Sequence, residues 1–224
     1  MRKTTASVIN LGCRVNRVES DKIAVGLISH GFELVDEDEA QLIVINTCAV
    51  TGEAEAKTRK AVRKAAGRSL EPIVIVTGCV VNLNPGELTS ISDRVIAEPS
   101  KADVVSRALH AIGRVADSSE GRHLDDRESS TMLSVSSGEA HVDEDPHAIS
   151  DLLGRCRYGI KIQDGCNHRC TYCIVWKARG PERSVPLDSV IRDVRSAELA
   201  GVPEVVLTGV NLGAYRYELA DGTV

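Results

Sequence analysis

The chain has 224 residues, a formal net charge of −5 at pH 7, 42% hydrophobic residues and only 3% aromatic residues. This composition allows a core of aliphatic side chains, and no apolar run approaches the length that spans a bilayer, so we expect no membrane partner. The start of the chain lacks a secretory hydrophobic region, and the seven cysteines are an odd number. Both features favour reduced thiols in metal or redox chemistry over disulfides, and they predict a cytoplasmic protein.

The acidic residues are concentrated in one segment. Between Asp117 and Asp151 there are ten Asp and Glu residues and two arginines, a net charge of −8. Because the whole chain carries −5, the remainder carries +3. The net negative charge therefore does not exclude a nucleic-acid partner. The segment is rich in Ser and Gly and has almost no hydrophobic periodicity, so we interpret residues 117–154 as an acidic linker.

Apolar runs alternate with helical patterns along residues 1–116. The predicted strands are Ser7–Leu11, Leu42–Ile45, Ile73–Val76 and Arg94–Ala97, and the predicted helices cover residues 16–28, 53–66 and 100–112. Asn16 and Glu19 fit the N-cap and N3 positions of the first helix, and Gly67 fits the end of the second. Continuous Val and Ile runs between helices predict an α/β domain with an open parallel sheet that is covered on both faces.

Three of these strands are closely followed by a cysteine, namely Cys13, Cys48 and Cys79. Ligands of open α/β sheets bind beyond the carboxyl ends of the strands. The three thiols are therefore predicted to converge there, although they are 35 and 31 residues apart in the sequence. This convergence predicts a site with three thiolate ligands. The alternative is that each cysteine is a small buried hydrophobic residue, as free cysteine often is.

A second unit begins at residue 155 and continues to residue 224. Tyr158–Gln163 is typical of a strand, Pro186–Ala200 of an amphipathic helix, and Glu204–Leu207 of the next strand. This order predicts a right-handed crossover at the start of a (β/α) barrel. A complete barrel of eight units takes about 250 residues. We therefore expect a truncated barrel domain with poor activity on its own.

The first strand of this unit leads into Cys166, Cys170 and Cys173, a C-x3-C-x2-C run. Cysteine thiolates are the usual ligands of iron–sulfur clusters, which generally take four, so three ligands leave one iron of a cubane free for a substrate or cofactor. A zinc loop is the alternative, but structural zinc takes four tetrahedral protein ligands. Only His168 or Cys156 could supply the fourth ligand, and the spacing of neither fits well.

This cysteine run resembles the signature of the radical SAM enzymes, and its surroundings resemble their methylthiotransferase branch. The similar stretches are Ile162–Cys166, Ala178–Gly180, Arg183–Ser184 and Leu207–Asn211. The resemblance implies a [4Fe–4S] cluster on the three cysteines, with an open iron that binds S-adenosyl-L-methionine. It also implies that Tyr172 lies near the adenine of this cofactor and that Thr208, Gly209 and Asn211 bind its amino end.

The amino-terminal region resembles the first domain of the same methylthiotransferases at Leu11–Asn16, Asn46–Thr51 and Thr77–Cys79. In that family these three cysteines hold an auxiliary [4Fe–4S] cluster, so the resemblance implies two clusters. Val50-Thr51, with Ala56-Lys57 following, looks most like the branch that acts on N6-threonylcarbamoyladenosine in tRNA. The alternatives within the family are isopentenyladenosine in tRNA and an aspartate of a ribosomal protein.

The resemblance implies radical methylthiolation of C2 of the modified adenosine at tRNA position 37. The expected partners are tRNA and an electron donor such as flavodoxin or ferredoxin. Basic residues of the second predicted helix could contact phosphates, although a solvated helix face is the simpler interpretation. These residues are Lys57, Arg59, Lys60, Arg63 and Lys64. Outside this enzyme class, the chain could be a non-catalytic iron–sulfur binding module or an inactive truncated remnant.

Overall fold

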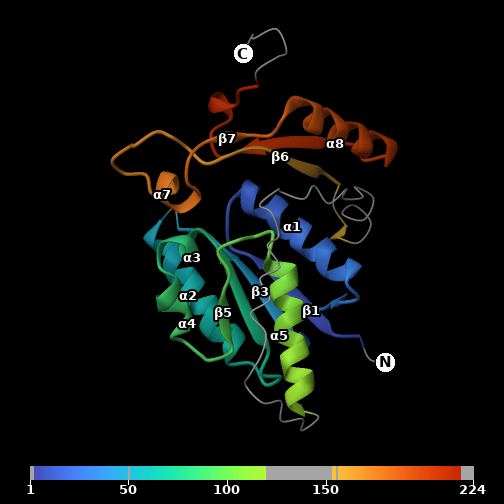
Figure 1. Cartoon of the computed structure of the whole chain (residues 1–224), viewed down its shortest axis with the longest axis vertical. Helices are drawn as coiled ribbons and strands as arrows, with labels where there is room; N and C mark the ends of the chain where they lie inside the picture. Colours follow the sequence, from blue (N-terminus) through green and yellow to red (C-terminus); the bar gives the residue numbers. More distant parts are fainter. Residues whose placement is uncertain (1–2, 50, 120–152, 155, 218–224) are drawn as a thin grey trace, which may run out of the picture.

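A computed structural model describes residues 3–49, 51–119, 153–154 and 156–217. Most of the predicted acidic linker, residues 117–154, lies outside these ranges. The described residues form two sheets, each with its own helices (Figure 1). None of the helices in the described ranges is long and apolar enough to cross a membrane.

The first sheet is parallel throughout and has the strand order β2-β1-β3-β4-β5. Its strands are β1 (Thr5–Asn10), β2 (Glu33–Leu34), β3 (Leu42–Thr47), β4 (Ile73–Gly78) and β5 (Val95–Ala97). The helices of this part are α1 (Arg14–Ser29), α2 (Gly52–Ala66), α3 (Cys79–Leu83), α4 (Pro85–Thr89) and α5 (Val104–Ser119). The predicted open parallel α/β sheet is confirmed.

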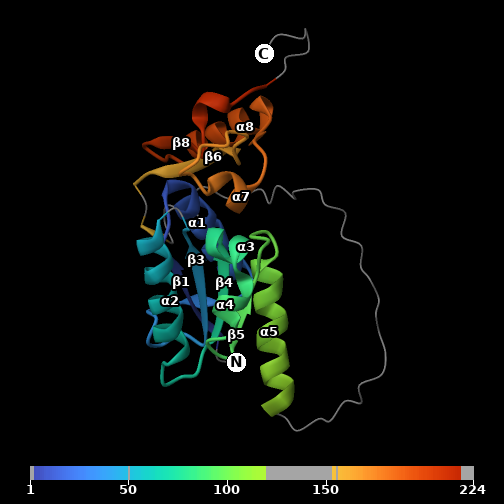
Figure 2. The ribbon, with the colours of Figure 1, turned by 90° about the vertical axis from the view of Figure 1, so that its left-hand side faces the viewer.

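Both faces of this sheet are buried because side chains of each strand alternate between two cores. Ile43 and Ile45 of β3 pack with α2, α3 and α4 on one face, where Val62 and Leu88 are fully buried. Leu42 and Val44 point to the other face and pack with α1 and α5. Figure 2 shows α2 and α5 on opposite sides of the sheet. This double cover explains the continuous apolar runs in the sequence.

The second sheet is smaller and has the order β7-β6-β8. Its elements are β6 (Tyr158–Asp164), α7 (Val175–Arg179), β7 (Arg183–Ser184), α8 (Leu187–Leu199), β8 (Val205–Gly209) and the 3₁₀ turn η1 (Leu212–Ala214). β6 and β8 are parallel and are joined through α8, as the start of a (β/α) barrel requires. β7 pairs antiparallel with the end of β6, which the sequence does not predict.

Helix α1 contacts both sheets, and this contact positions the two parts. Val25 of α1 belongs to the core formed by Tyr158, Ile160 and Ile162 of β6. At the other end of the interface α7 packs against α3, and Asn82 Nδ2 donates a hydrogen bond to the Ala178 carbonyl oxygen at 2.7 Å. Figure 1 shows α1 beneath β6 and α7 beside α3. The second unit therefore rests on the end of the first sheet where α1 and α3 begin.

The start of α1 differs from the prediction. The helix begins at Arg14, with Cys13 as its N-cap residue, so Asn16 and Glu19 lie within the helix and do not cap it. Both side chains are buried, with 0% and 5% exposure respectively, because the second unit covers this part of α1. The predicted end of α2 is confirmed, since Gly67 is its C-cap residue.

Candidate functional site

Cys13, Cys48 and Cys79 lie at the carboxyl ends of three neighbouring strands, and we call these three residues the cysteine edge. Cys13 caps α1 just beyond β1, Cys48 directly follows β3, and Cys79 is the first residue of α3 after β4. The register places Asn10 opposite Asn46 and Thr47 opposite Gly78, so the three strands end level with one another. The arrangement of strands on which the sequence prediction depended is confirmed.

Asn16 is the polar centre beneath the cysteine edge. Its Nδ2 donates to Asn46 Oδ1 at 3.0 Å and to the Thr47 carbonyl oxygen at 2.7 Å. Its Oδ1 accepts from the Cys13 thiol at 3.4 Å. Asn46 Nδ2 in turn donates to the Asn16 carbonyl oxygen at 2.9 Å and to Ser20 Oγ at 3.1 Å. Asn16 thereby joins the loop after β1 to the end of β3.

The residue before Cys79 must be glycine because the backbone is tightly packed there. Gly78 has φ +100°, and a Cβ added to it would lie 2.5 Å from the Thr47 carbonyl oxygen and 2.7 Å from Asn46 Oδ1. Thr47 Oγ1 donates to the Thr77 carbonyl oxygen at 2.8 Å and accepts from the Val80 amide at 3.3 Å. These contacts fix the backbone on both sides of Cys79.

The second set of cysteines lies in the cysteine loop, which we define as residues 166–173, between β6 and α7. The Cys166 amide donates to the Gly180 carbonyl oxygen, and the Cys173 amide donates to the Cys170 carbonyl oxygen, both at 3.1 Å. Gly165 has φ +71°, and a Cβ there would collide with the Pro181 backbone, so the loop leaves β6 through an obligatory glycine. Cys170 is exposed, whereas Cys166 and Cys173 are half-buried.

All seven cysteines are described residues, and none of them forms a disulfide. Within the described ranges, no three His, Cys, Asp or Glu side chains are gathered closely enough to hold a metal ion. The backbone brings the members of each set to one edge or one loop, but their side chains must still turn toward a common centre. Three thiols in each set match the donors that an iron–sulfur cluster takes. The ligand roles of the six cysteines therefore stay predictions.

The four residues expected to bind S-adenosyl-L-methionine lie near the ends of β6 and β8. Thr208 is buried in β8, whereas Tyr172 on the cysteine loop is 90% exposed. A Cβ on Gly209 would lie 2.9 Å from Gln163 Cβ, so the ends of β8 and β6 approach closely. The Asn211 amide donates to Gln163 Oε1 at 2.7 Å. The roles of the four residues stay predictions.

Gln163 links this strand end to the cysteine loop. It is fully buried, and its Nε2 donates to the carbonyl oxygens of Asp164 at 3.1 Å and Gly165 at 2.9 Å. Together with the bond to Asn211, these contacts satisfy both ends of the amide. Gln163 is not among the residues predicted from the sequence to form the site, although its place directly before Asp164-Gly165 is a signal that could have identified it.

An ion-pair network lies between the two units, and we call Glu19, Lys101, Lys161, Asp164 and Arg179 the Glu19 network. Arg179 Nη1 lies 3.0 Å from both Glu19 Oε1 and Asp164 Oδ1. Lys161 Nζ lies 3.2 Å from Glu19 Oε1 and 3.1 Å from Asp164 Oδ2, and Lys101 also pairs with Glu19. The network therefore joins α1, β6 and α7 with the segment before α5.

Both carboxylates of this network are ionised at neutral pH. Burial acts to raise the pKa of Glu19, but Lys101, Arg179 and Lys161 outweigh it and hold that pKa below its ordinary value. Burial likewise opposes ionisation of Asp164, yet Lys161 and Arg179 lower its pKa to about 2. Burial lowers the pKa of Lys101, against the attraction of Glu19. Lys101, Lys161 and Arg179 thus face the two carboxylates, and the half-exposed Arg183 lies 3.8 Å from Asp164.

Two family models match the sequence in the order of the two units. Residues 5–97 match "Uncharacterized protein family UPF0004", and residues 160–221 match the radical SAM superfamily. The threonylcarbamoyladenosine tRNA methylthiotransferase MtaB of Aquifex aeolicus is 32% identical over 213 residues, which cover 93% of this chain and 48% of that protein. The relatives that match nearly the whole chain are named as methylthiotransferases. The chain spans about half the length of these relatives.

A relative from another branch of the methylthiotransferases matches at the same percentage identity. The tRNA-2-methylthio-N(6)-dimethylallyladenosine synthase of Deinococcus radiodurans is 32% identical, and the match covers 94% of this chain and 39% of that protein. A solved structure, the cobalamin-dependent S-adenosylmethionine radical enzyme OxsB with aqua-cobalamin and S-adenosylmethionine bound, aligns with a TM-score of 0.51 and 12% identity. The alignment covers 99% of this chain and 35% of OxsB. At this low identity it supports the fold alone.

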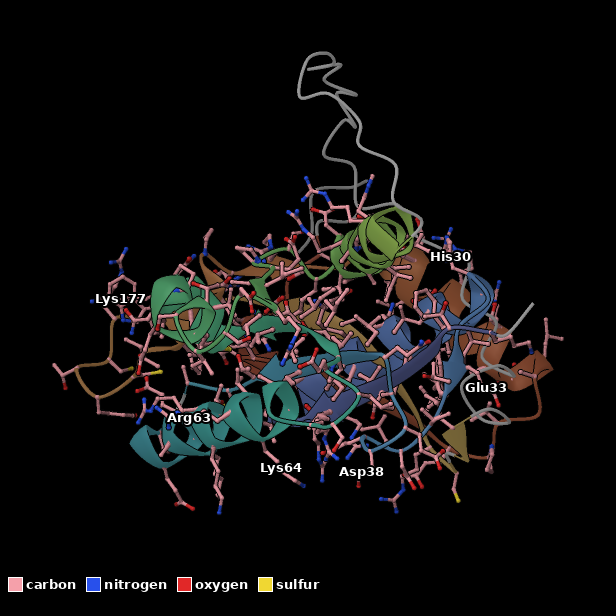
Figure 3. The ribbon with its side chains drawn as sticks, turned by 90° about the horizontal axis from the view of Figure 1, so that it is seen from below. His30, Glu33, Asp38, Arg63, Lys64 and Lys177 are labelled. Atoms are coloured by element: carbon pink, nitrogen blue, oxygen red, sulfur yellow. The ribbon has the colours of Figure 1, made fainter. Side chains whose placement is uncertain are left out.

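The basic residues of α2 are largely paired with carboxylates. Lys57 pairs with Glu53, Arg59 with Glu87 and Lys64 with Glu37, at distances of 2.8, 3.3 and 3.6 Å. Figure 3 shows Arg63 and Lys64 on the outer side of α2. This pairing favours the interpretation of a solvated helix face over a dedicated phosphate site.

Proposed function

We propose that the chain carries the amino-terminal portion of a tRNA-modifying methylthiotransferase. The reaction is radical methylthiolation of C2 of N6-threonylcarbamoyladenosine at tRNA position 37, carried out in the cytoplasm. One observation carries the proposal. The helices that adjoin the two cysteine sets, α3 after β4 and α7 after the cysteine loop, pack against each other through the bond from Asn82 to the Ala178 carbonyl oxygen. Both sets therefore lie at one interface.

The proposed domains follow the predicted boundaries. Residues 1–116 would hold an auxiliary [4Fe–4S] cluster through Cys13, Cys48 and Cys79. Residues 155–224 would hold a second cluster through Cys166, Cys170 and Cys173 and would begin the radical SAM domain. Residues 117–154 would be the acidic linker between them, although helix α5 continues to Ser119 and includes the first three of these residues.

The residues of the chain have distinct parts in this proposal. When bound, the two clusters and S-adenosyl-L-methionine supply the radical chemistry and the sulfur, with an electron from a donor such as flavodoxin or ferredoxin. A loop with three thiolates leaves room for one further ligand on its cluster. Thr208, Gly209 and Asn211 bind the amino end of S-adenosyl-L-methionine, and Tyr172 covers its adenine. Gln163 keeps Asn211 in place through the bond to its amide.

The choice of tRNA substrate rests on a few residues. A relative from the threonylcarbamoyladenosine branch and one from the dimethylallyladenosine branch are each 32% identical to this chain. We favour the former branch because of Val50-Thr51 and Ala56-Lys57 in the sequence. Thr51 also has a structural function here, since its hydroxyl accepts from the Ala54 amide at 3.1 Å and caps α2.

Anaerobic reconstitution with iron and sulfide tests this proposal. Two cubanes predict about eight irons per chain. Under reducing conditions the reconstituted protein should release 5′-deoxyadenosine from S-adenosyl-L-methionine, and methylthiolation should occur on tRNA that bears threonylcarbamoyladenosine but not on unmodified tRNA. Iron binding without release of 5′-deoxyadenosine would instead support a non-catalytic iron–sulfur module, and a chain that binds no iron would be a remnant.

A further inference from the structure

Arg179 holds together both ends of the cysteine loop. It is the last residue of α7, six positions after Cys173, and its side chain is only 6% exposed. Its Nη1 donates at 3.0 Å to Asp164, the residue at the end of β6 before the loop begins. The Asp164 carboxylate also accepts from the Gly165 amide at 2.8 Å, next to Cys166. One guanidinium thereby fixes the entry and the exit of the loop.

The same guanidinium binds Asn16, the polar centre beneath the cysteine edge. Arg179 Nη2 donates to Asn16 Oδ1 at 2.5 Å and to Glu19 Oε2 at 3.3 Å. Asn16 Oδ1 is also the acceptor for the Cys13 thiol, and Asn16 Nδ2 holds the Thr47 carbonyl oxygen beside Cys48. Thr47 Oγ1 accepts from the Val80 amide beside Cys79. A continuous set of hydrogen bonds therefore runs from Arg179 to the neighbourhood of all three cysteines.

The charge of Arg179 is only part of what it contributes to the buried carboxylates. Without it, Lys101 and Lys161 still face Glu19 and Asp164, and the charges of the remaining Glu19 network balance. What the lysines lack is a planar fork that donates in several fixed directions at once. Arg179 donates in this way to three side chains, on α1, at the end of β6 and at the polar centre beneath the cysteines. Arg179 therefore contributes directional hydrogen bonds that the two lysines do not supply.

We propose that Arg179 is a positioning residue that fixes the cysteine loop relative to the cysteine edge. This inference deepens the proposed function and rests on it, because a group carried at one cysteine set must meet a substrate activated at the other. Such reactions depend on alignment, and a misplacement of about 1 Å can cost roughly a hundredfold in rate.

The test compares R179K and R179Q with the matched control R157Q. R179K keeps the charge and loses the fork, so it remains informative if R179Q folds poorly. Arg157 forms a 2.8 Å pair with Glu204 in the same unit, but both side chains are more than half exposed. Hydrogen–deuterium exchange is measured on the full chain for three amides bonded at the two sites, those of Arg17, Cys166 and Cys173. The amides of Ile45 and Val76 report on the first core.

We expect R179K and R179Q to accelerate exchange at Arg17, Cys166 and Cys173 by about tenfold or more, because charge-assisted hydrogen bonds are lost at both sites. Exchange at Ile45 and Val76 should not change, and R157Q should alter none of the five. Unchanged exchange at the loop, or a uniform increase that includes Ile45 and Val76, would overturn the inference, since Arg179 would then be dispensable or a general stabiliser.

A second readout separates this inference from the proposed function. After reconstitution, iron content and 5′-deoxyadenosine release should match the wild type in R179K, whereas methylthiolated tRNA per 5′-deoxyadenosine should fall about tenfold or more. An unchanged ratio would overturn the positioning role. If the wild type itself releases 5′-deoxyadenosine and forms no methylthiolated tRNA, the proposed function fails, and the exchange pattern alone decides the role of Arg179.

Discussion

Asn16 and Asn46 exchange a pair of hydrogen bonds between α1 and the end of β3. Asn16 Nδ2 donates to Asn46 Oδ1 at 3.0 Å, and Asn46 Nδ2 donates to the Asn16 carbonyl oxygen at 2.9 Å. Both side chains are completely buried. Because buried polar groups that lose their partners cannot turn to water instead, this pair makes the cysteine edge sensitive to single substitutions.

Replacement of Asn16 by alanine should lower the free energy of unfolding by about 2–4 kcal/mol. The variant leaves Asn46 Oδ1 and the Thr47 carbonyl oxygen without their donor in a buried site. Urea unfolding of the protein in the presence of a chelator measures the change without interference from metal. The matched control is Asn84→Ala, an exposed asparagine, for which we expect a change below about 0.5 kcal/mol. Equal effects of both substitutions would refute the central position of Asn16.

Gly78→Ala should destabilise the protein far more than Gly31→Ala. Both glycines have positive φ, +100° and +89°, so both substitutions carry backbone strain of about 1 kcal/mol. A Cβ at Gly31 meets nothing within 4 Å among the described residues, whereas at Gly78 it lies 2.5 Å from the Thr47 carbonyl oxygen. We expect a loss above about 3 kcal/mol for Gly78→Ala, read from the shift of the urea midpoint. Similar midpoints for the two variants would show that the close approach is not rigid.

Glu19→Gln should cost about 3–5 kcal/mol at pH 7, because buried cations lose their main counter-charge. The pKa of Glu19 is lowered in the folded state, so its stabilisation is fully present above the unfolded value of 4.5 and is lost as the pH falls through the folded pKa. The difference in unfolding free energy between wild type and Glu19→Gln should therefore shrink below about pH 4.5.

Urea unfolding of the chelated protein at several pH values between 7 and 3 measures this difference. Glu204→Gln serves as the control, because Glu204 is half-exposed in its pair with Arg157 and should change the stability by less than about 1 kcal/mol. A difference that stays constant down to pH 3 would contradict the ionised, paired state of Glu19.

Substitution of one cysteine by alanine in either set should remove about four irons per chain after reconstitution and leave the other cluster in place. Cys48→Ala represents the cysteine edge and Cys170→Ala the cysteine loop. Cys156→Ala is the control, because this exposed thiol belongs to neither set and should leave about eight irons. Iron and sulfide analysis, with electron paramagnetic resonance of the reduced protein, distinguishes the two clusters. A loss of metal in Cys156→Ala would favour the zinc alternative.

The first sheet could be predicted from the sequence because its signal is local. Val and Ile runs that lie between helices identify β3 and β4, and their parallel register then places Cys48 and Cys79 at one edge. The two-residue strands β2 and β7 carry no such pattern, since a pair such as Glu33–Leu34 forms a strand only through its neighbour. Short elements of this kind are determined by tertiary contacts.

The polar interface could not be predicted for a related reason. A cap and a buried ion pair require the same residue types, and Asn16 with Glu19 has the spacing of a capping pair. Their actual partner, Arg179, is 163 and 160 residues away in the sequence. No local sequence pattern indicates a contact across this separation. The sequence therefore predicts a capping pair, whereas in the fold both side chains bind Arg179.

Helix α1 packs against both units, and this limits how the two units can be exchanged between related proteins. Its Leu27 packs against the first sheet, and its Val25 packs in the core around Tyr158. Its Val18 lies so close to Gly159 that any larger residue at position 159 of β6 would displace the Val18 side chain. A chimaera joined inside residues 117–154 would pair this helix with a foreign β6. Exchanges of the second unit should therefore succeed only when the incoming β6 keeps the residues that pack against α1, whatever the sequence of the linker.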